Sequence, residues 1–204
     1  MQLPRLPIAS KAIFFIASIT ISTWASAHTG ADNHGHTGFL AGFFHPLMGL
    51  DHLAAMVAVG VWSGLAARRA GPELLWGPLA FANMLLVGAL MGLQGIDLPA
   101  VEPMIATSLL VIGLLVVVRL HVSAVATTVL IGLFAVFHGL AHGLELANTA
   151  SAFETLAGML CATVLLHATG LGLGWLLRAA HVWVPRIAGG AVATFGSVLL
   201  LQLT

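Results

Sequence analysis

One stretch of the sequence decides the class of fold: V122-S-A-V-A-T-T-V-L-I-G-L-F-A-V-F137, followed by H138-G-L-A-H142-G-L-E145. Its first part carries no charged side chain, whereas its second part carries two histidines and a glutamate. An apolar run of this length is typical of a helix that crosses a lipid bilayer. Burying ionisable groups at membrane depth costs free energy, so the two histidines and the glutamate at the end of this helix call for an explanation.

The composition of the whole chain indicates a membrane protein. Hydrophobic residues make up 59% of the 204 residues and charged residues 7%, and the mean hydropathy is +1.05. Soluble globular proteins contain about 25% charged residues, so this chain is too apolar to be one. The formal net charge is zero, and no basic cluster offers a footprint for nucleic acid or for an anionic membrane surface. The single cysteine, Cys161, excludes an intrachain disulfide.

The first 27 residues are typical of an export signal peptide. Arg5 and Lys11 precede an apolar run, and Ala25-Ser-Ala27 forms a small-x-small cleavage site. We predict cleavage after Ala27, which makes His28 the N-terminus of the mature protein. An uncleaved anchor would leave the orientation of the later segments unchanged.

Six further segments are long and apolar enough to cross a bilayer as helices. Glycine, proline and arginine residues punctuate the breaks between them. We predict an all-α membrane protein, a bundle of six transmembrane helices after a cleavable signal peptide. An exported histidine-rich tail covers 28–37 and the transmembrane domain covers 38–204. The six predicted spans are 38–66, 73–94, 101–119, 122–144, 151–177 and 185–203.

The distribution of arginine predicts the orientation of these spans. After the signal peptide, the basic residues other than histidine all belong to the first, third and fifth connections, and they are Arg68, Arg69, Arg119, Arg178 and Arg186. The second and fourth connections hold Asp97, Glu102, Glu145 and Glu154. Because positively charged connections stay in the cytoplasm, both ends of the mature protein are predicted to lie outside it.

Small residues recur at a spacing that favours close packing of helices. Gly88-Ala-Leu-Met-Gly92 and Gly139-Leu-Ala-His-Gly143 each place two glycines on one face of a helix. We expect both segments to lie in helix contacts.

Two clusters of ionisable residues lie within the predicted spans. In the fourth span, His138, His142 and Glu145 lie on one face, since they are spaced by about one helical turn. The first span contains H45-P-L-M-G-L-D51-H52. In the predicted topology both clusters lie in the outer half of the bilayer, where they can meet.

The local structure of the first cluster has two interpretations. His45 and His52 share a face if the first span is one continuous helix. Pro46 could instead begin the helix, with residues 38–45 forming a separate short turn. The relation between the two histidines is open in that case.

The chemistry of these residues predicts a metal site. Neutral imidazole is a common ligand of nickel, zinc, copper and iron. Asp51 and Glu145 together carry two negative charges, and a divalent cation would neutralise them and lower the cost of burying charge in lipid. His167, which stands alone in the fifth span, is expected to form a hydrogen bond between helices.

Both motifs resemble those of the HupE/UreJ family of bacterial membrane proteins. H45-P-L-M-G-L-D51-H52 matches His, five residues, Asp-His, and F137-H-G-L-A-H-G-L-E145 matches Phe-His-Gly-x-Ala-His-Gly-x-Glu. The resemblance implies an inner-membrane permease that supplies nickel to hydrogenase or urease, and it assigns no role to Phe137. The residues that it implies for handling nickel are His45, Asp51, His52, His138, His142 and Glu145. The preference for nickel rests on the family alone, because the same ligands suit cobalt or zinc.

The exported tail, H28-T-G-A-D-N-H-G-H36, is a second candidate for metal capture. His28, His34 and His36 could collect metal at the outer face, with His28 chelating through its freed α-amine and its imidazole. The alternative is a tail with incidental histidines, and deletion of residues 31–38 would distinguish the two at limiting nickel.

The expected function is transport rather than catalysis, with Ni²⁺ as cargo and no prosthetic group. The sequence contains no G-x-x-x-x-G-K-[S/T] motif, which excludes ATP hydrolysis through a P-loop. Nickel would therefore enter the cytoplasm by facilitated diffusion or in exchange for protons. The same ligands would also serve an intramembrane metalloenzyme or a metal-sensing accessory protein.

Overall fold

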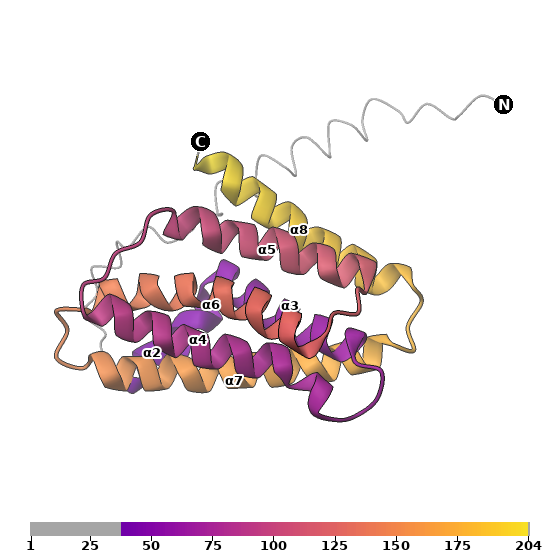
Figure 1. Cartoon of the computed structure of the whole chain (residues 1–204), viewed down its shortest axis with the longest axis horizontal. Helices are drawn as coiled ribbons and strands as arrows, with labels where there is room; N and C mark the ends of the chain where they lie inside the picture. The colour runs from indigo at the N-terminus through magenta and orange to yellow at the C-terminus, as the bar shows by residue number, and fades with distance from the viewer. Residues whose placement is uncertain (1–37, 204) are drawn as a thin grey trace.

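A computed structural model describes residues 38–203, and within that range the chain consists of α-helices and one short 3₁₀ turn (Figure 1). The predicted all-α architecture is therefore confirmed. The predicted signal peptide and the tail with His28, His34 and His36 lie outside the described residues. The elements are α2 (Phe39–Met48), α3 (Leu50–Ala66), η1 (Pro72–Leu74), α4 (Trp76–Leu93), α5 (Val101–Val118), α6 (Ala124–Leu146), α7 (Ala152–Leu177) and α8 (Trp183–Gln202).

The helices have the length and surface of a multi-pass membrane protein. Five of them, α4 to α8, are long and apolar enough to cross a bilayer, and α2 with α3 provides a sixth span if the bent pair counts as one. Large apolar side chains such as Val125, Leu176 and Leu201 are more than 70% exposed. An aqueous protein avoids such a surface, whereas lipid tails accept it.

The first predicted span is not one straight helix. It is divided into α2 and α3, which are bent by 80° at Gly49. Gly49 has an extended ψ of 115°, and its N–H donates to the carbonyl of His45. Both interpretations made from the sequence are therefore wrong, because Pro46 is buried inside α2 and does not begin the helix.

Packing against α7 explains why a helix forms ahead of Pro46. A Cβ atom built on Gly42 would lie 1.9 Å from the carbonyl oxygen of Thr155, and one on Gly158 would lie 2.0 Å from that of Phe39. The two glycines thus let the backbones of α2 and α7 touch. This contact holds α2 in place although Pro46 cannot donate a backbone hydrogen bond.

The predicted glycine contacts are confirmed between α4 and α6. A Cβ on Gly88 would lie 2.1 Å from the Val136 carbonyl oxygen, and a Cβ on Gly139 would lie 1.9 Å from the Leu85 carbonyl oxygen. Gly60 of α3 approaches α7 in the same way. Close helix pairs of this kind fix the helices that carry the ionisable residues.

The two ends of the bundle differ in charge. We call the end formed by connections 67–75, 119–123 and 178–182 the arginine end, and the end formed by connections 94–100 and 147–151 the acidic end (Figure 1). Two hydrogen bonds hold the arginine end together: the Arg178 guanidinium donates to the Ala67 carbonyl of another connection, and Nε1 of Trp62, near the end of α3, donates to the Leu120 carbonyl. The alternation of charge along the sequence thus becomes a difference between two ends of the bundle.

Candidate metal centre

The bend between α2 and α3 lies beside the last turns of α6, near the acidic end. α2 contributes His45, and the first turn of α3 contributes Asp51 and His52. α6 passes the bend with His138 and His142 on its buried face. The fold therefore brings together the two clusters that are far apart in the sequence.

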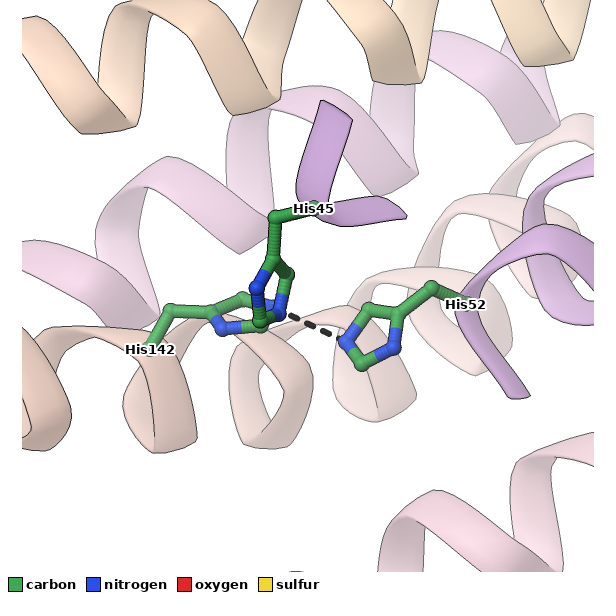
Figure 2. Close-up of side chains that lie close together, drawn as sticks. All are labelled: His45, His52 and His142. Carbon is green, nitrogen blue, oxygen red and sulfur yellow. Dashed lines mark hydrogen bonds between the residues drawn. The ribbon is translucent and has the colours of Figure 1, made fainter. Parts of the chain in front are cut away.

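Three imidazoles form the centre of the cluster, and they belong to His45, His52 and His142 (Figure 2). One ring nitrogen from each lies within 4.8 Å of the other two. The Nε2 atoms of His52 and His142 are 2.9 Å apart. The ring centroid of His45 lies 4.9 Å from that of His142 and 5.4 Å from that of His52. His52 and His142 are each 1% exposed, so the donors are shielded from solvent.

The three imidazoles have the chemistry of a transition-metal site. The separation of 2.9 Å between His52 Nε2 and His142 Nε2 is that of a hydrogen bond between the two rings. One nitrogen from each of the three rings lies within 4.8 Å of the others, so the rings are close enough to share one ion. Imidazole is a suitable ligand for nickel, zinc, copper and iron.

Asp51 orients the His52 ring. Its Oδ1 accepts a hydrogen bond of 2.9 Å from His52 Nδ1, and the Asp51 side chain is 6% exposed. Because a carboxylate only accepts, the proton of the ring is on Nδ1, and Nε2 presents its lone pair to the cluster. A carboxylate behind a metal-binding histidine commonly fixes the tautomer in this way.

Glu145 lies on the outer side of the cluster. Its Oε2 is 3.6 Å from His142 Nδ1, and its side chain is 36% exposed. This distance permits an ion pair when the imidazole is charged but exceeds that of a normal hydrogen bond. Glu145 therefore combines contact with the cluster and access from the acidic end.

His138 lies next to the three imidazoles but is not one of them. It is fully buried, and its Nδ1 donates a hydrogen bond of 3.1 Å to the Phe134 carbonyl. Its ring centroid is 5.8 Å from that of His52. Phe137, the preceding motif residue, is half-buried.

Two further residues shape the site and escaped the sequence analysis. A Cβ atom on Gly49 would lie 2.9 Å from His52 Nδ1 and 3.1 Å from Asp51 Oδ1, so any side chain there would press on this pair. The ring of Phe81 on α4 is fully buried and contacts His138, with centroids 5.4 Å apart. Gly49 stood inside the quoted motif, whereas nothing in the sequence around Phe81 distinguishes it from a lipid-facing or core phenylalanine.

Comparison with known proteins agrees with the two motifs. The profile of the family described as HupE / UreJ protein matches residues 16–199. This chain belongs to the HupE/UreJ family of hydrogenase and urease accessory proteins. It is 40% identical over 195 residues to Protein HupE of Rhizobium leguminosarum bv. viciae, and the match covers 94% of this chain and 98% of that protein. No solved structure matches the chain.

Proposed function

We propose that this protein is a nickel permease, which carries Ni²⁺ across the inner membrane through the centre at the bend between α2 and α3. The observation that carries the proposal is the convergence of His45, His52 and His142, with one nitrogen from each within 4.8 Å of the others. Imidazole donors suit nickel, although cobalt and zinc accept similar ligands. The family of accessory proteins to two nickel-containing enzymes makes nickel the preferred cargo.

The two carboxylates complete the electrostatics of the centre. Asp51 and Glu145 contribute two negative charges, which balance a divalent ion, so the loaded site is formally neutral. Neutrality lowers the cost of moving the ion into a region of low dielectric constant. The role proposed for Asp51 is to hold His52, and the role proposed for Glu145 is to attract the cation at the entrance.

The charge difference between the ends supports a direction of transport. Arginine-rich connections remain on the cytoplasmic side of a membrane. The acidic end and the metal centre then face the periplasm, the side on which both termini of the mature protein are predicted to lie. Nickel would enter beside Glu145 and leave at the arginine end.

Protons are the candidate coupling ions. His52 Nδ1 donates its proton to Asp51, so His52 Nε2 can only accept. In the hydrogen bond between the two Nε2 atoms, His142 is therefore the donor. Metal binding displaces protons from its ligands, and this links loading to proton release. Nickel flux in proteoliposomes should therefore be accompanied by proton flux. A rate of nickel flux that does not depend on a pH gradient would instead indicate facilitated diffusion.

Uptake of radioactive nickel tests the proposal in cells that lack other nickel importers. We expect the wild-type protein to raise uptake, and His45→Ala and His142→Ala to lower the gain about 10–100-fold. His181→Asn is the matched control, because His181 is exposed in the connection between α7 and α8. An enzyme or a sensor would bind nickel without any gain in uptake, and competition with cobalt and zinc would measure selectivity.

A further inference from the structure

His167 on α7 has an unusual environment for a histidine inside a helix bundle. It is 2% exposed, and its Nδ1 donates a hydrogen bond of 2.8 Å to the Thr163 carbonyl on the same helix. This bond differs from the interhelical one expected from the sequence. Because a carbonyl only accepts, the proton is on Nδ1 and Nε2 carries a lone pair. That nitrogen has no hydrogen-bond partner within residues 38–203.

A buried nitrogen without a partner is uncommon in a folded protein and calls for an explanation. Its protonation state is the one that a metal ligand needs, because metals bind the lone pair of a neutral imidazole. The bond to Thr163 resembles the support that metal-binding histidines receive from a backbone carbonyl. His138 has the same arrangement, with its Nδ1 bonded to the Phe134 carbonyl four residues earlier.

His167 lies deeper in the bundle than the metal centre. Its carbonyl oxygen would be 2.5 Å from a Cβ atom on Gly60, which follows His52 by eight residues along α3. At 1.5 Å per residue this places the backbone carbonyl of His167 about 12 Å closer to the arginine end than the backbone of His52. His138 precedes His142 by one turn of α6 and lies about 6 Å deeper than it. The histidines therefore descend in steps of roughly one helical turn.

Phe81 connects the last two steps of this series. Its ring centroid is 5.4 Å from that of His138 and 5.1 Å from that of His167. One aromatic ring thus contacts both imidazoles, which belong to different helices.

A buried hydroxyl group and a cavity lie further along α3, towards the arginine end. Ser63 follows Gly60 by three residues on α3, and its buried Oγ has no hydrogen-bond partner in the described part of the chain. Ser63 lines a cavity of about 420 Å³ at the arginine end, together with Trp62, Arg68, Glu73, His121 and Thr127. Polar groups therefore continue from His167 towards this end.

We infer that His167 is a second metal-binding position, which receives a divalent transition-metal ion from the outer histidines and passes it to the cavity at the arginine end. The inference rests on the proposed transport function. It assigns a ligand role to a histidine outside both family motifs, with His138 as the intermediate position and Phe81 as the side chain that contacts both.

Two substitutions of His167 test this inference by different measurements. His167→Asn keeps an amide donor close to the Thr163 carbonyl but removes Nε2. We expect its nickel uptake in proteoliposomes to fall at least about tenfold, while the affinity of the purified protein for nickel at the outer histidines is unchanged. His181→Asn is the matched control and should transport like the wild type. Uptake by His167→Asn equal to that of the control would overturn the inference.

The second substitution separates a ligand from a packing residue. His167→Cys, made in a Cys161→Ser background, replaces a nitrogen ligand by a thiolate, which prefers softer metals. We expect the ratio of Cd²⁺ uptake to Ni²⁺ uptake to rise about tenfold over the Cys161→Ser background. An unchanged ratio would overturn the inference, even if His167→Asn proves too unstable to purify. Wild-type protein that takes up no nickel would remove both proposals, whereas uptake that depends on His52 but not on His167 would remove this one alone.

Discussion

The two sides of the metal centre are built differently. α6 is an uninterrupted helix of 23 residues, and its histidines and glutamate follow one another along a single face. α2 and α3 are separate helices that meet at Gly49 with a bend of 80°. Seven residues of continuous helix would separate the backbones of His45 and His52 by about 10.5 Å along the axis. With the bend, their ring centroids are 5.4 Å apart.

This difference shows that a straight helix and a broken one make separate contributions to a ligand set. The straight helix sets the depth of each group, because every residue adds a fixed rise. The bend makes groups converge, because it turns His45 back over the start of α3. Each side also has its own support: glycines hold α6 against α4, and glycines hold α2 against α7. The centre should therefore fail in different ways when either side is disturbed.

Gly139→Val is expected to have the largest effect, because it removes the support of the straight helix. A Cβ atom at this position would lie 1.9 Å from the Leu85 carbonyl oxygen, and a helix backbone cannot move aside as a side chain can. We expect a loss of stability of at least about 3 kcal/mol, at the upper end for overpacked sites. Gel filtration of detergent extracts should recover little folded protein.

Gly190→Val on α8 is the matched control, because nothing lies within 4 Å of a Cβ atom there. Equal recovery of the two variants would show that close contact between α4 and α6 does not depend on Gly139.

Gly49→Ala should spare the fold and damage only the bent side. Its Cβ would press on the hydrogen-bonded pair of His52 and Asp51, at 2.9 Å and 3.1 Å. Nickel affinity measured by calorimetry is expected to fall about 10–100-fold, as it does when the support of a ligand is lost. Gly172→Ala, with nothing within 4 Å of its Cβ, should bind like the wild type. Normal affinity in Gly49→Ala would mean that the bend does not determine the site.

Asp51→Asn should have a smaller effect on the same side, because an amide oxygen can still accept the bond from His52 Nδ1. The substitution removes the negative charge and keeps the shape. We expect nickel affinity to fall about tenfold, and Asp51→Ala to be worse since it also releases the ring. Asp97→Asn, at an exposed acid of the acidic end, is the control. If the Asp51→Asn and Asp51→Ala proteins bind nickel with equal affinity, the affinity depends on the charge of Asp51 and not on its hydrogen bond to His52.

The sequence predicts the straight side of the centre better than the bent side. The spacing of His138, His142 and Glu145 determines a common face because helical periodicity holds along an unbroken helix. The bend follows from the contact of α2 with α7, which involves residues more than a hundred positions apart. Within the motif, Pro46 is a stronger signal for a helix boundary than Gly49, although the bend is at Gly49. Phe81 could not be recognised, since a phenylalanine in an apolar helix has no local signal.

Glu145→Gln should have the smallest effect, and it sharpens the contrast between a buried carboxylate and an exposed one. The Glu145 side chain is 36% exposed, compared with 6% for that of Asp51. Attraction at an exposed site is screened within about 8 Å at physiological ionic strength, whereas a buried pair is screened much less. We therefore expect nickel uptake at subsaturating concentration to fall about threefold at low salt, because steering of the cation is weakened. This deficit should shrink as salt is raised, whereas that of Asp51→Asn should persist.

Glu154→Gln, at an exposed acid near the start of α7, is the control. A loss in Glu145→Gln that is independent of salt and as large as that of Asp51→Asn would make Glu145 a direct ligand, and α6 would then supply two of the groups that hold the metal.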